Sequence, residues 1–255
     1  MVACFNYSKN INYMNYLEIV TNIFSSIVSW DTNMLLKLNS WNNLFFDGFM
    51  WITTSILVWL PLYISVIYII IKNKKKESII ILFSLMLAIV LADQLASSIL
   101  KPLVERLRPT HNEDLMPYIH TVNGYKGGIY GFVSSHAANA FAFVVFTAFL
   151  FRQFSYISLM LLWALLLSYS RIYLGVHFPL DVIVGALLGG GIGYAAFVFY
   201  QLLKRIMPQY VYKKHKTNSR HYSPFSVKDL SPFFFCFVIT LFFSILFAYN
   251  FSFFE

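Results

Sequence analysis

Residues 170–203 read SRIYLGVHFPLDVIVGALLGGGIGYAAFVFYQLL. A polar stretch that carries Arg171, His177 and Asp181 leads directly into a long apolar run, Asp181–Leu203. A run of about 20 apolar residues is long enough to cross a hydrocarbon core of roughly 30 Å as an α-helix. This stretch therefore predicts a membrane-spanning helix with ionisable groups at its beginning.

Long apolar runs recur along the whole chain. The 255 residues are 58% hydrophobic and 12% charged, with a mean hydropathy of +0.64, which is too apolar for an ordinary soluble domain. A buried core in a soluble helical protein would not need so many such runs. The sequence therefore predicts an all-α, polytopic membrane protein with six transmembrane helices. They are Asp47–Ile71, Ser78–Leu100, His136–Phe151, Ser155–Tyr169, Asp181–Leu203 and Pro232–Phe251.

The residues before the first run, 1–46, are predicted to form a separate N-terminal segment, followed by one membrane domain over residues 47–255. Apolar residues recur at helical spacing within Leu17–Phe46, which favours one or two amphipathic helices on the membrane surface. A short additional span is the alternative, although several charged and Asn residues argue against it. Residues 1–16 show no signal-peptide pattern and are expected to be a tail.

Basic residues are concentrated in alternate connections between the predicted spans. By the positive-inside rule these connections face the cytoplasm, so both termini and the segments 101–135 and 170–181 lie outside. The net charge of +8 is therefore a topology signal, and no motif for nucleic-acid binding is present. The basic residues are Lys72, Lys74, Lys75, Lys76, Arg152, Lys204, Arg205, Lys213, Lys214, Lys216, Arg220 and Lys228.

The first polar cluster outside the membrane contains Lys101 and Arg108, followed by Pro109. If the helix continues past Pro102, the two cations lie two turns apart on one face, about 10 Å along the axis. Two long side chains at that separation can close on one phosphate. Ordinary snorkelling at the membrane edge would explain either residue alone.

The second cluster, Ser134, Ser135 and His136, opens the third apolar run. A helix N-terminus offers free N–H groups and a partial positive charge to an anion. The serines add hydroxyl donors, and the imidazole can titrate near neutral pH. A plain serine cap beside a surface histidine is an equally good explanation of this cluster alone.

The third cluster places His177 four residues before Asp181, with Pro179 where a helix would begin. A hydrogen bond from one imidazole nitrogen to the carboxylate would fix the tautomer and leave the other nitrogen free to attack phosphorus. Arg171 adds an oxygen clamp. The simpler alternative is a histidine satisfied by a carboxylate at the membrane edge.

Together these residues resemble the type 2 phosphatidic acid phosphatase and vanadium haloperoxidase superfamily. Its signature runs K-x6-R-P, then P-S-G-H, then S-R-x5-H-x3-D. The first and third parts are complete here, from Lys101 to Pro109 and from Ser170 to Asp181. The second part reads Val133-Ser134-Ser135-His136, so Val and Ser replace the family's Pro and Gly. The match covers residues 101–181.

The resemblance implies phosphoryl transfer without a metal or other cofactor. His177 would be the nucleophile and form a phosphohistidine, Asp181 would orient it, and His136 would be the general acid and then the base. The phosphate oxygens would be bound by cations and donors that stabilise the charge of the transition state. These are Lys101, Arg108, Ser134, Ser135 and Arg171.

Asp93 lies inside the second predicted span, where an ionisable group is costly and so a candidate for function or for pairing with another helix. Gln94, Ser97 and Ser98 are predicted to share a helical face with Lys101 and support it.

The partners implied are the lipid bilayer and a membrane lipid with a phosphorylated headgroup. The expected activity is hydrolysis of a lipid phosphate or diphosphate at the outer face of a bacterial inner membrane. Undecaprenyl diphosphate is the preferred substrate; lipid A, phosphatidylglycerol phosphate and phosphatidate are alternatives. A phosphotransferase that passes phosphate to a second lipid, and a non-enzymatic lipid transport protein, are the alternatives from other classes.

Overall fold

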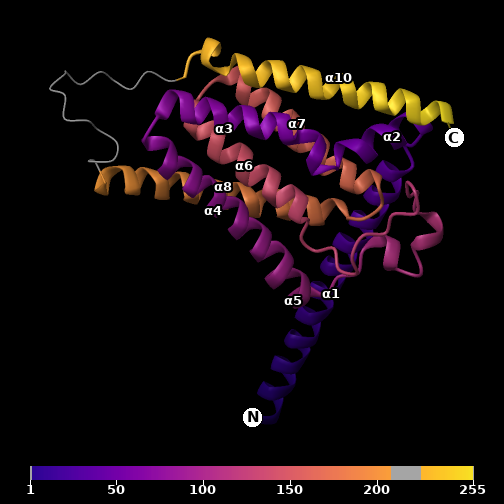
Figure 1. Ribbon diagram of the computed structural model, residues 1–255. Helices are drawn as coiled ribbons and strands as arrows, with labels where there is room; N and C mark the ends of the chain where they lie inside the picture. Colours follow the sequence, from indigo (N-terminus) through magenta and orange to yellow (C-terminus); the bar gives the residue numbers. More distant parts are fainter. Residues whose placement is uncertain (1, 208–224, 255) are drawn as a thin grey trace.

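The computed structural model describes residues 2–207 and 225–254, and side chains within 18–207 and 225–252 (Figure 1). The described residues are predominantly helical, and their one β-pairing is an isolated bridge between Leu107 and Tyr130. The all-α prediction is confirmed. The main helices are α1 (Val2–Asn39), α2 (Leu44–Thr53), α3 (Leu60–Lys74), α4 (Glu77–Gln94), α5 (Lys101–Val104), α6 (Ser135–Phe151), α7 (Phe154–Tyr173), α8 (Pro179–Ile206) and α10 (Ser231–Phe254).

Five helical segments within the described residues are long and apolar enough to cross a membrane, which makes the chain a multi-pass membrane protein. They are Ile56–Lys74, Glu77–Val104, Phe154–Tyr173, Pro179–Ile206 and Val227–Ser252. The remaining predicted span is α6, which has 17 residues. At 1.5 Å per residue it is about 25 Å long, slightly less than a hydrocarbon core of roughly 30 Å. The count of six spans is therefore not confirmed by length.

The first predicted span, Asp47–Ile71, is wrong as a single helix. The structure divides it into α2, a short 3-10 helix (η1, Ile56–Trp59) and α3. Ser55 is extended, and the Trp59 side chain donates a hydrogen bond of 2.8 Å to the carbonyl of Thr53 across the corner. Pro61 has no N–H to donate and fits only the first turn of a helix, so it starts α3 instead of continuing α2.

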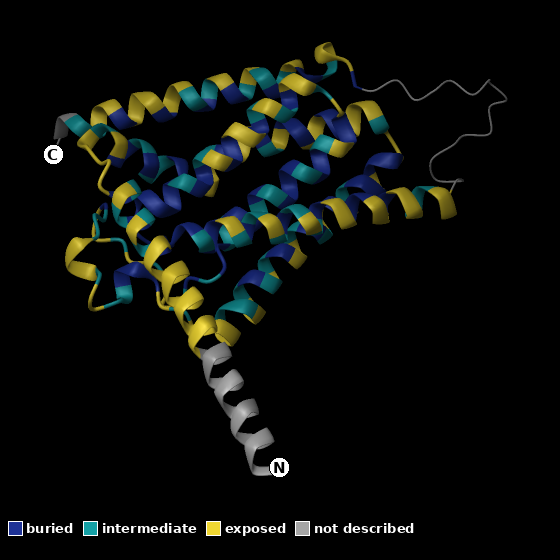
Figure 2. Ribbon diagram, turned by 180° about the vertical axis from the view of Figure 1, so that it is seen from behind, coloured by how far each residue is buried: buried dark blue, intermediate teal, exposed yellow. Residues whose placement is uncertain are grey.

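The N-terminal segment is one continuous helix, α1, where a tail and one or two shorter helices were expected. It projects away from the bundle, and its described residues from Glu18 to Trp30 are exposed (Figures 1 and 2). From Asp31 onward, buried residues recur where α1 contacts α7 and α8. Its place on the membrane surface stays a prediction.

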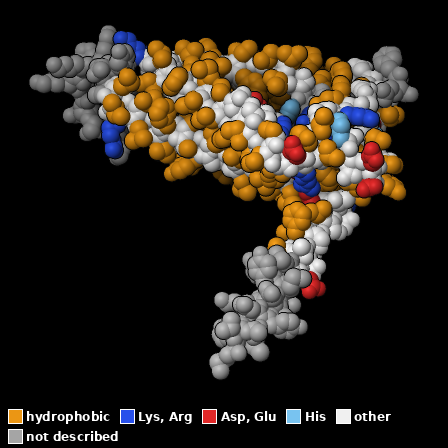
Figure 3. Space-filling view, turned by 90° about the horizontal axis from the view of Figure 1, so that it is seen from below, with side chains coloured by type: hydrophobic (Ala, Val, Ile, Leu, Met, Phe, Trp, Pro, Cys, Tyr) orange, Lys and Arg blue, Asp and Glu red, His pale blue; other side chains and the backbone are white. Residues whose placement is uncertain are grey.

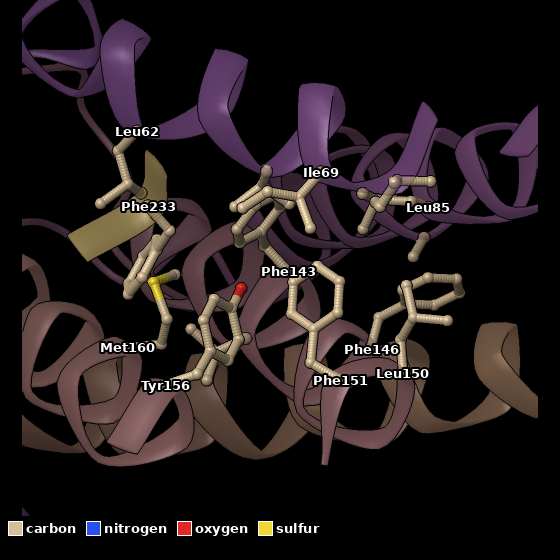
Figure 4. Close-up of a cluster of buried hydrophobic side chains, with 14 of the residues drawn as sticks. Leu62, Ile69, Leu85, Phe143, Phe146, Leu150, Phe151, Tyr156, Met160 and Phe233 are labelled. Carbon is tan, nitrogen blue, oxygen red and sulfur yellow. The ribbon is translucent and has the colours of Figure 1, made fainter. Parts of the chain in front are cut away.

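The core of the bundle is a cluster of aliphatic and aromatic side chains from α3, α4, α6, α7, α8 and α10, and part of it is shown in Figure 4. Trp59 and Trp163 meet edge to face with ring centroids 5.8 Å apart, and Phe143 contacts Trp163 in the same way. In lipid these contacts do not remove apolar surface from water, so the stabilisation comes from close van der Waals packing.

The closest helix pair is α6 with α8, and glycine makes this approach possible. Gly185, Gly189 and Gly193 recur every fourth residue along one face of α8, and we refer to them as the glycine seam. A Cβ added to them would lie 2.5, 1.9 and 2.4 Å from the carbonyl oxygens of Ser134, Ala138 and Ala142. Small residues at such spacing let membrane helices pack backbone to backbone. The seam holds the first turns of α6 and α8 side by side.

Candidate active site

The three polar clusters meet at one end of the bundle. This end contains the start of α6, the end of α7, the start of α8 and the segment that follows α5. Seen from below, histidine and acidic side chains gather with basic ones toward the end from which α1 projects, whereas basic side chains also appear at the opposite end (Figure 3). The surface between them is mostly hydrophobic.

Lys101 and Arg108 do not share a helix face, so that prediction is wrong. The helix ends at Val104, and Glu105 adopts a left-handed conformation with φ 51°. Arg108 is extended because the residue before a proline avoids the helical region. Its N–H donates to the carbonyl of Ile129. The chain folds back here, and this turn brings Arg108 toward the other two clusters.

Lys101 donates a hydrogen bond of 3.1 Å to the Ser135 hydroxyl, which joins the first cluster to the second. In the described part of the chain, Lys101 donates to Ser135 and to none of Gln94, Ser97 and Ser98, and the Ser98 hydroxyl donates to Gln94, so the predicted support is not found. Residues Leu95–Leu100 form a π-helix, whose different repeat changes the face on which Lys101 lies.

Arg108 and Arg171 bring buried, unpaired donors to the site. Arg108 is 7% exposed and Arg171 is 2% exposed. Arg108 Nη1 and Arg171 Nε have no hydrogen-bond partner among the described residues. Gly127, with φ +67°, lies so close that a Cβ would be 2.4 Å from Arg108 Nη1. Unpaired buried guanidinium N–H groups are costly, so their presence indicates a place for an anion.

His177 and Asp181 lie at the start of α8 and are almost completely buried. The Nδ1 atom of His177 is 3.5 Å from Asp181 Oδ2, longer than a normal hydrogen bond. Neither imidazole nitrogen has a partner within normal hydrogen-bond geometry in the described part of the chain. The carboxylate faces Nδ1, so Nε2 is the nitrogen left for chemistry.

Ser134 caps α6: its hydroxyl accepts from the N–H of Ala137, and its own N–H donates to the Asp181 carbonyl at 2.9 Å. That second bond ties the start of α6 to the start of α8. His136 lies in the first turn of α6, close enough to His177 for the charge of one ring to act on the other. The second and third clusters therefore share one site.

The electrostatics of the site favour a neutral imidazole beside an anion. Burial and the positive charges of Arg108, Arg171 and Lys101 lower the pKa of His177 well below its ordinary value. The ring is therefore neutral near pH 7 and keeps a lone pair. Burial and the charge of Arg171 also lower the pKa of Arg108. A bound phosphate would relieve the mutual repulsion of these cations.

A cavity of 620 Å³ opens beside His136. Most of its wall is apolar, and the polar residues at one end include Thr54, Asp93 and Asn139. Asn139 donates a hydrogen bond of 3.1 Å to Asp93, so the ionisable residue inside the second span is paired with another helix. The apolar wall residues are Ile56, Trp59, Tyr63, Ile67, Leu82, Leu85, Met86, Ile89, Val90, Ala140, Phe143 and Leu167.

Similarity to known proteins, together with this geometry, decides the family. Residues 77–205 match the model of the PAP2 superfamily. The chain belongs to the PAP2 superfamily. A lipid A 4'-phosphatase of Bacteroides thetaiotaomicron is 39% identical over 69% of this chain and 78% of its own length. A second lipid A 4'-phosphatase, from Porphyromonas gingivalis, is 35% identical over 68% and 74% of the two chains.

The crystal structure of Aquifex aeolicus LpxE superposes with a TM-score of 0.50 at 25% identity, covering 65% of this chain and 93% of LpxE. The undecaprenyl-diphosphatase of Sulfolobus acidocaldarius is 32% identical over 54% of this chain. This PAP2 chain is thus a membrane lipid phosphatase, a hydrolase of phosphoric esters. The preference for undecaprenyl diphosphate is not supported, because the more similar relatives are named for lipid A.

Several residues that shape this PAP2 site were not predicted from the sequence. Thr54, at the corner between α2 and η1, accepts a hydrogen bond from Arg171. The Tyr125 hydroxyl accepts another at 3.3 Å. Burial alone would raise the pKa of Tyr125, but the hydrogen bond and charge of Arg171, with the charge of Arg108, lower it. Neither Thr54 nor Tyr125 belongs to one of the three sequence motifs. The only sequence feature that indicated a corner between α2 and η1 was the interruption of the apolar run before Pro61.

Proposed function

We propose that this protein is a lipid A 4'-phosphatase that works through a phosphohistidine on His177. The observation that carries the proposal is that an anion-binding region and an apolar cavity adjoin. The anion-binding region contains the buried guanidinium N–H groups of Arg108 and Arg171 that have no partner among the described residues. The apolar cavity begins beside His136. A headgroup phosphate fits the first environment and an acyl chain fits the second.

In the first chemical step, Nε2 of neutral His177 attacks phosphorus. The bond from phosphorus to the ester oxygen breaks, and His136 gives the departing oxygen a proton that the negative charge of the bound phosphate has stabilised on its ring. Asp181, 3.5 Å from Nδ1, stabilises the positive charge that develops on the attacked ring. In the second step, water attacks the phosphohistidine and gives a proton to His136. The P–N bond breaks, phosphate leaves, and both histidines return to their starting states.

Oxyanion stabilisation is assigned to Lys101, Arg108, Arg171 and the two serines at the start of α6. Charge on the three equatorial oxygens grows toward the transition state, so preorganised cations are expected to supply a large part of the catalysis. The free N–H groups of the first turn of α6 add donors from the backbone. The Ser134 hydroxyl already accepts from Ala137, but its own proton is available for a phosphate oxygen.

The polar end of the cavity favours lipid A over a prenyl diphosphate. Asp93 and Asn139 lie in the cavity wall, and Asn139 is one helical turn from His136. Their oxygens accept hydrogen bonds, and an acylated amino sugar offers hydroxyl and amide N–H donors a few bonds from its phosphate. The hydrocarbon of a prenyl diphosphate offers none. The names of the two similar relatives point in the same direction.

Placement of the site at the outer face of a bacterial inner membrane rests on the charges at the other end. Lys74 and Lys204 lie near Glu77, where α3, α4 and α8 meet at the end opposite the histidines. The positive-inside rule assigns that end to the cytoplasm, which leaves the site outside. Labelling of a single added cysteine near Asn123 with an impermeant reagent in intact cells tests this orientation.

The function is tested with purified protein in detergent and lipid A labelled with ³²P at the 4' or the 1 position. We expect release of inorganic phosphate from the 4' label without any acceptor lipid. The kcat/KM should exceed those for undecaprenyl diphosphate and phosphatidate at equal surface concentration by at least about tenfold, the equivalent of 1.4 kcal/mol. Preference for either of the other lipids would overturn the substrate assignment. Release that requires an acceptor lipid would indicate a phosphotransferase.

A further inference from the structure

Arg106 occupies a central position that none of the three motifs assigns. Its Nη1 donates to Asp181 Oδ1 at 2.8 Å, and its Nη2 donates to Asp31 Oδ2 at 2.7 Å. Both carboxylates are fully buried, whereas the Arg106 side chain is 23% exposed. Its guanidinium lies over the ring of Phe178, 3.8 Å from the centroid. Arg106 is thus fixed by two acids and one aromatic ring.

Asp31 reaches this network from α1. Its second oxygen accepts from the N–H of Leu180 at 2.8 Å, in the first turn of α8. Asp181 Oδ2 accepts from the N–H of Phe178 at 3.0 Å. All four carboxylate oxygens therefore have a donor, and three of the four bonds hold the start of α8. A long helix outside the PAP2 match, α1, contributes directly to the geometry around His177.

We propose that Arg106, held by Asp31, is a positioning residue that sets the orientation of Asp181 and limits how much of its negative charge acts on His177. The proposal rests on the proposed function, because it assumes that His177 is the nucleophile. Arg106 is not assigned to the phosphate, since both of its terminal nitrogens are used by carboxylates. An Asp181 without Arg106 would be free to turn toward Nδ1, 3.5 Å away, and hold a proton there.

The charged and titratable groups around His177 come from every element packed against it. Lys101 comes from α5, Arg108 from the following loop, His136 from α6, Arg171 from α7 and Asp181 from α8. Lys101, Arg108 and Arg171 repel a proton on His177, whereas the Asp181 carboxylate and the nearby backbone carbonyl of Gly131 favour one. The salt bridge to Arg106 weakens the attraction of Asp181 for that proton. Loss of the bridge therefore raises the affinity of His177 for a proton, and the nucleophile becomes protonated at a higher pH.

The test compares Arg106→Gln, Arg106→Lys and Asp31→Asn in the full-length protein with ³²P-labelled lipid A. We expect Arg106→Gln to lower kcat/KM about 30-fold and to move the acid limb of its pH profile upward by about one unit, since that profile reports the free enzyme. Arg106→Lys should keep most of the parental activity and the parental position of the acid limb of the pH profile. Asp31→Asn should give a smaller loss, about fivefold, in the same direction. Glu105→Gln, an exposed neighbour, is the matched control and should match the parent.

Two results would overturn the inference. Arg106→Gln could retain the parental pH profile while losing activity together with thermal stability, and Arg106 would then be only structural. It could also keep full activity. The proposed function is judged separately with His177→Ala. If His177→Ala is inactive and Arg106→Gln behaves like the parent, only the positioning role fails. If His177→Ala still turns over, the nucleophile assignment itself fails.

Discussion

The two faces of α6 pack in opposite ways. One face lies against the glycine seam, where Ala138 and Ala142 meet the backbone of α8 with no room for a methyl group. The other face lines the 620 Å³ cavity with His136, Asn139 and Phe143. One helix therefore has a closed side and an open side, and His136 stands at its first turn.

This difference shows how one helix of a membrane enzyme can be held rigidly on one face and still line a large cavity on the other. Backbone contact along the seam fixes the first turn of α6 relative to Asp181, and the bond from Ser134 N–H to the Asp181 carbonyl closes the end. If α6 were held by large side chains on its other face instead, those side chains would fill the cavity that is proposed to receive the lipid. In the proposed function, the closed side sets the position of His136 and the open side binds the substrate.

Removal of the His136 imidazole, in the first turn of α6, should have the largest effect. We expect His136→Ala to lower kcat on lipid A about 10³-fold, the middle of the usual range for a general acid and base, with KM changed less than threefold. Steady-state phosphate release measures both parameters. A kcat within tenfold of the parent would contradict the assignment, provided that thermal unfolding in detergent is unchanged.

The closed side is tested by Gly189→Ala. The new Cβ would lie 1.9 Å from the carbonyl oxygen of Ala138, so α6 and α8 must separate. Overpacking of this kind typically costs about 1–3 kcal/mol, and we expect a lower unfolding temperature and about a tenfold loss of kcat.

The matched control for the seam is Gly191→Ala, two residues along the same helix, where nothing lies within 4 Å of an added Cβ. Because alanine favours a helix over glycine by about 1 kcal/mol, this control should be as stable as the parent or slightly more stable. Equal effects of the two substitutions would show that the seam does not hold α6.

The open side is tested by Ala140→Leu, which fills part of the cavity. We expect the KM for long-chain lipid A to rise about tenfold, equivalent to 1.4 kcal/mol, with kcat nearly unchanged, because binding and not chemistry is affected. A phosphorylated substrate with short acyl chains serves as the control and should show no change. An equal rise in KM for both substrates would argue against the cavity as the acyl-chain site.

Chelation should have the smallest effect. Asp181, which faces His177, and Asp31 are both bound to Arg106. Among the described residues, no group of three or more His, Cys, Asp or Glu side chains could hold a metal ion. We expect EDTA to change phosphate release less than twofold. A larger loss that added Mg²⁺ or Zn²⁺ reverses would contradict the metal-free mechanism.

The sequence predicted the helical class and the residues that gather around His177, because each motif combines a fixed spacing with a demanding chemistry. It did not predict the corner at Thr54. The long apolar run favours one continuous helix, whereas Pro61 favours the start of a new helix, and the second effect prevails. It also missed Arg106 and Asp31, which are 75 residues apart and paired by tertiary folding alone.

Two signals in the sequence were available and were not used. Gly185, Gly189 and Gly193 recur at the four-residue spacing typical of close helix pairs in membranes. Asp31 is an acid within a largely apolar helical segment, which indicates a buried partner. Helix bounds near Lys101 were harder to predict, since a π-helical turn leaves no reliable pattern in the residues that form it.

The central claim is that lipid phosphate is transferred to Nε2 of His177 before water receives it. Rapid acid-free quenching of ³²P-labelled lipid A with the purified enzyme, followed by peptide mapping, tests it most directly. We predict an alkali-stable, acid-labile label on the peptide that contains His177, absent in His177→Ala. Full turnover with no label on that peptide, or a label on another residue, would contradict the account.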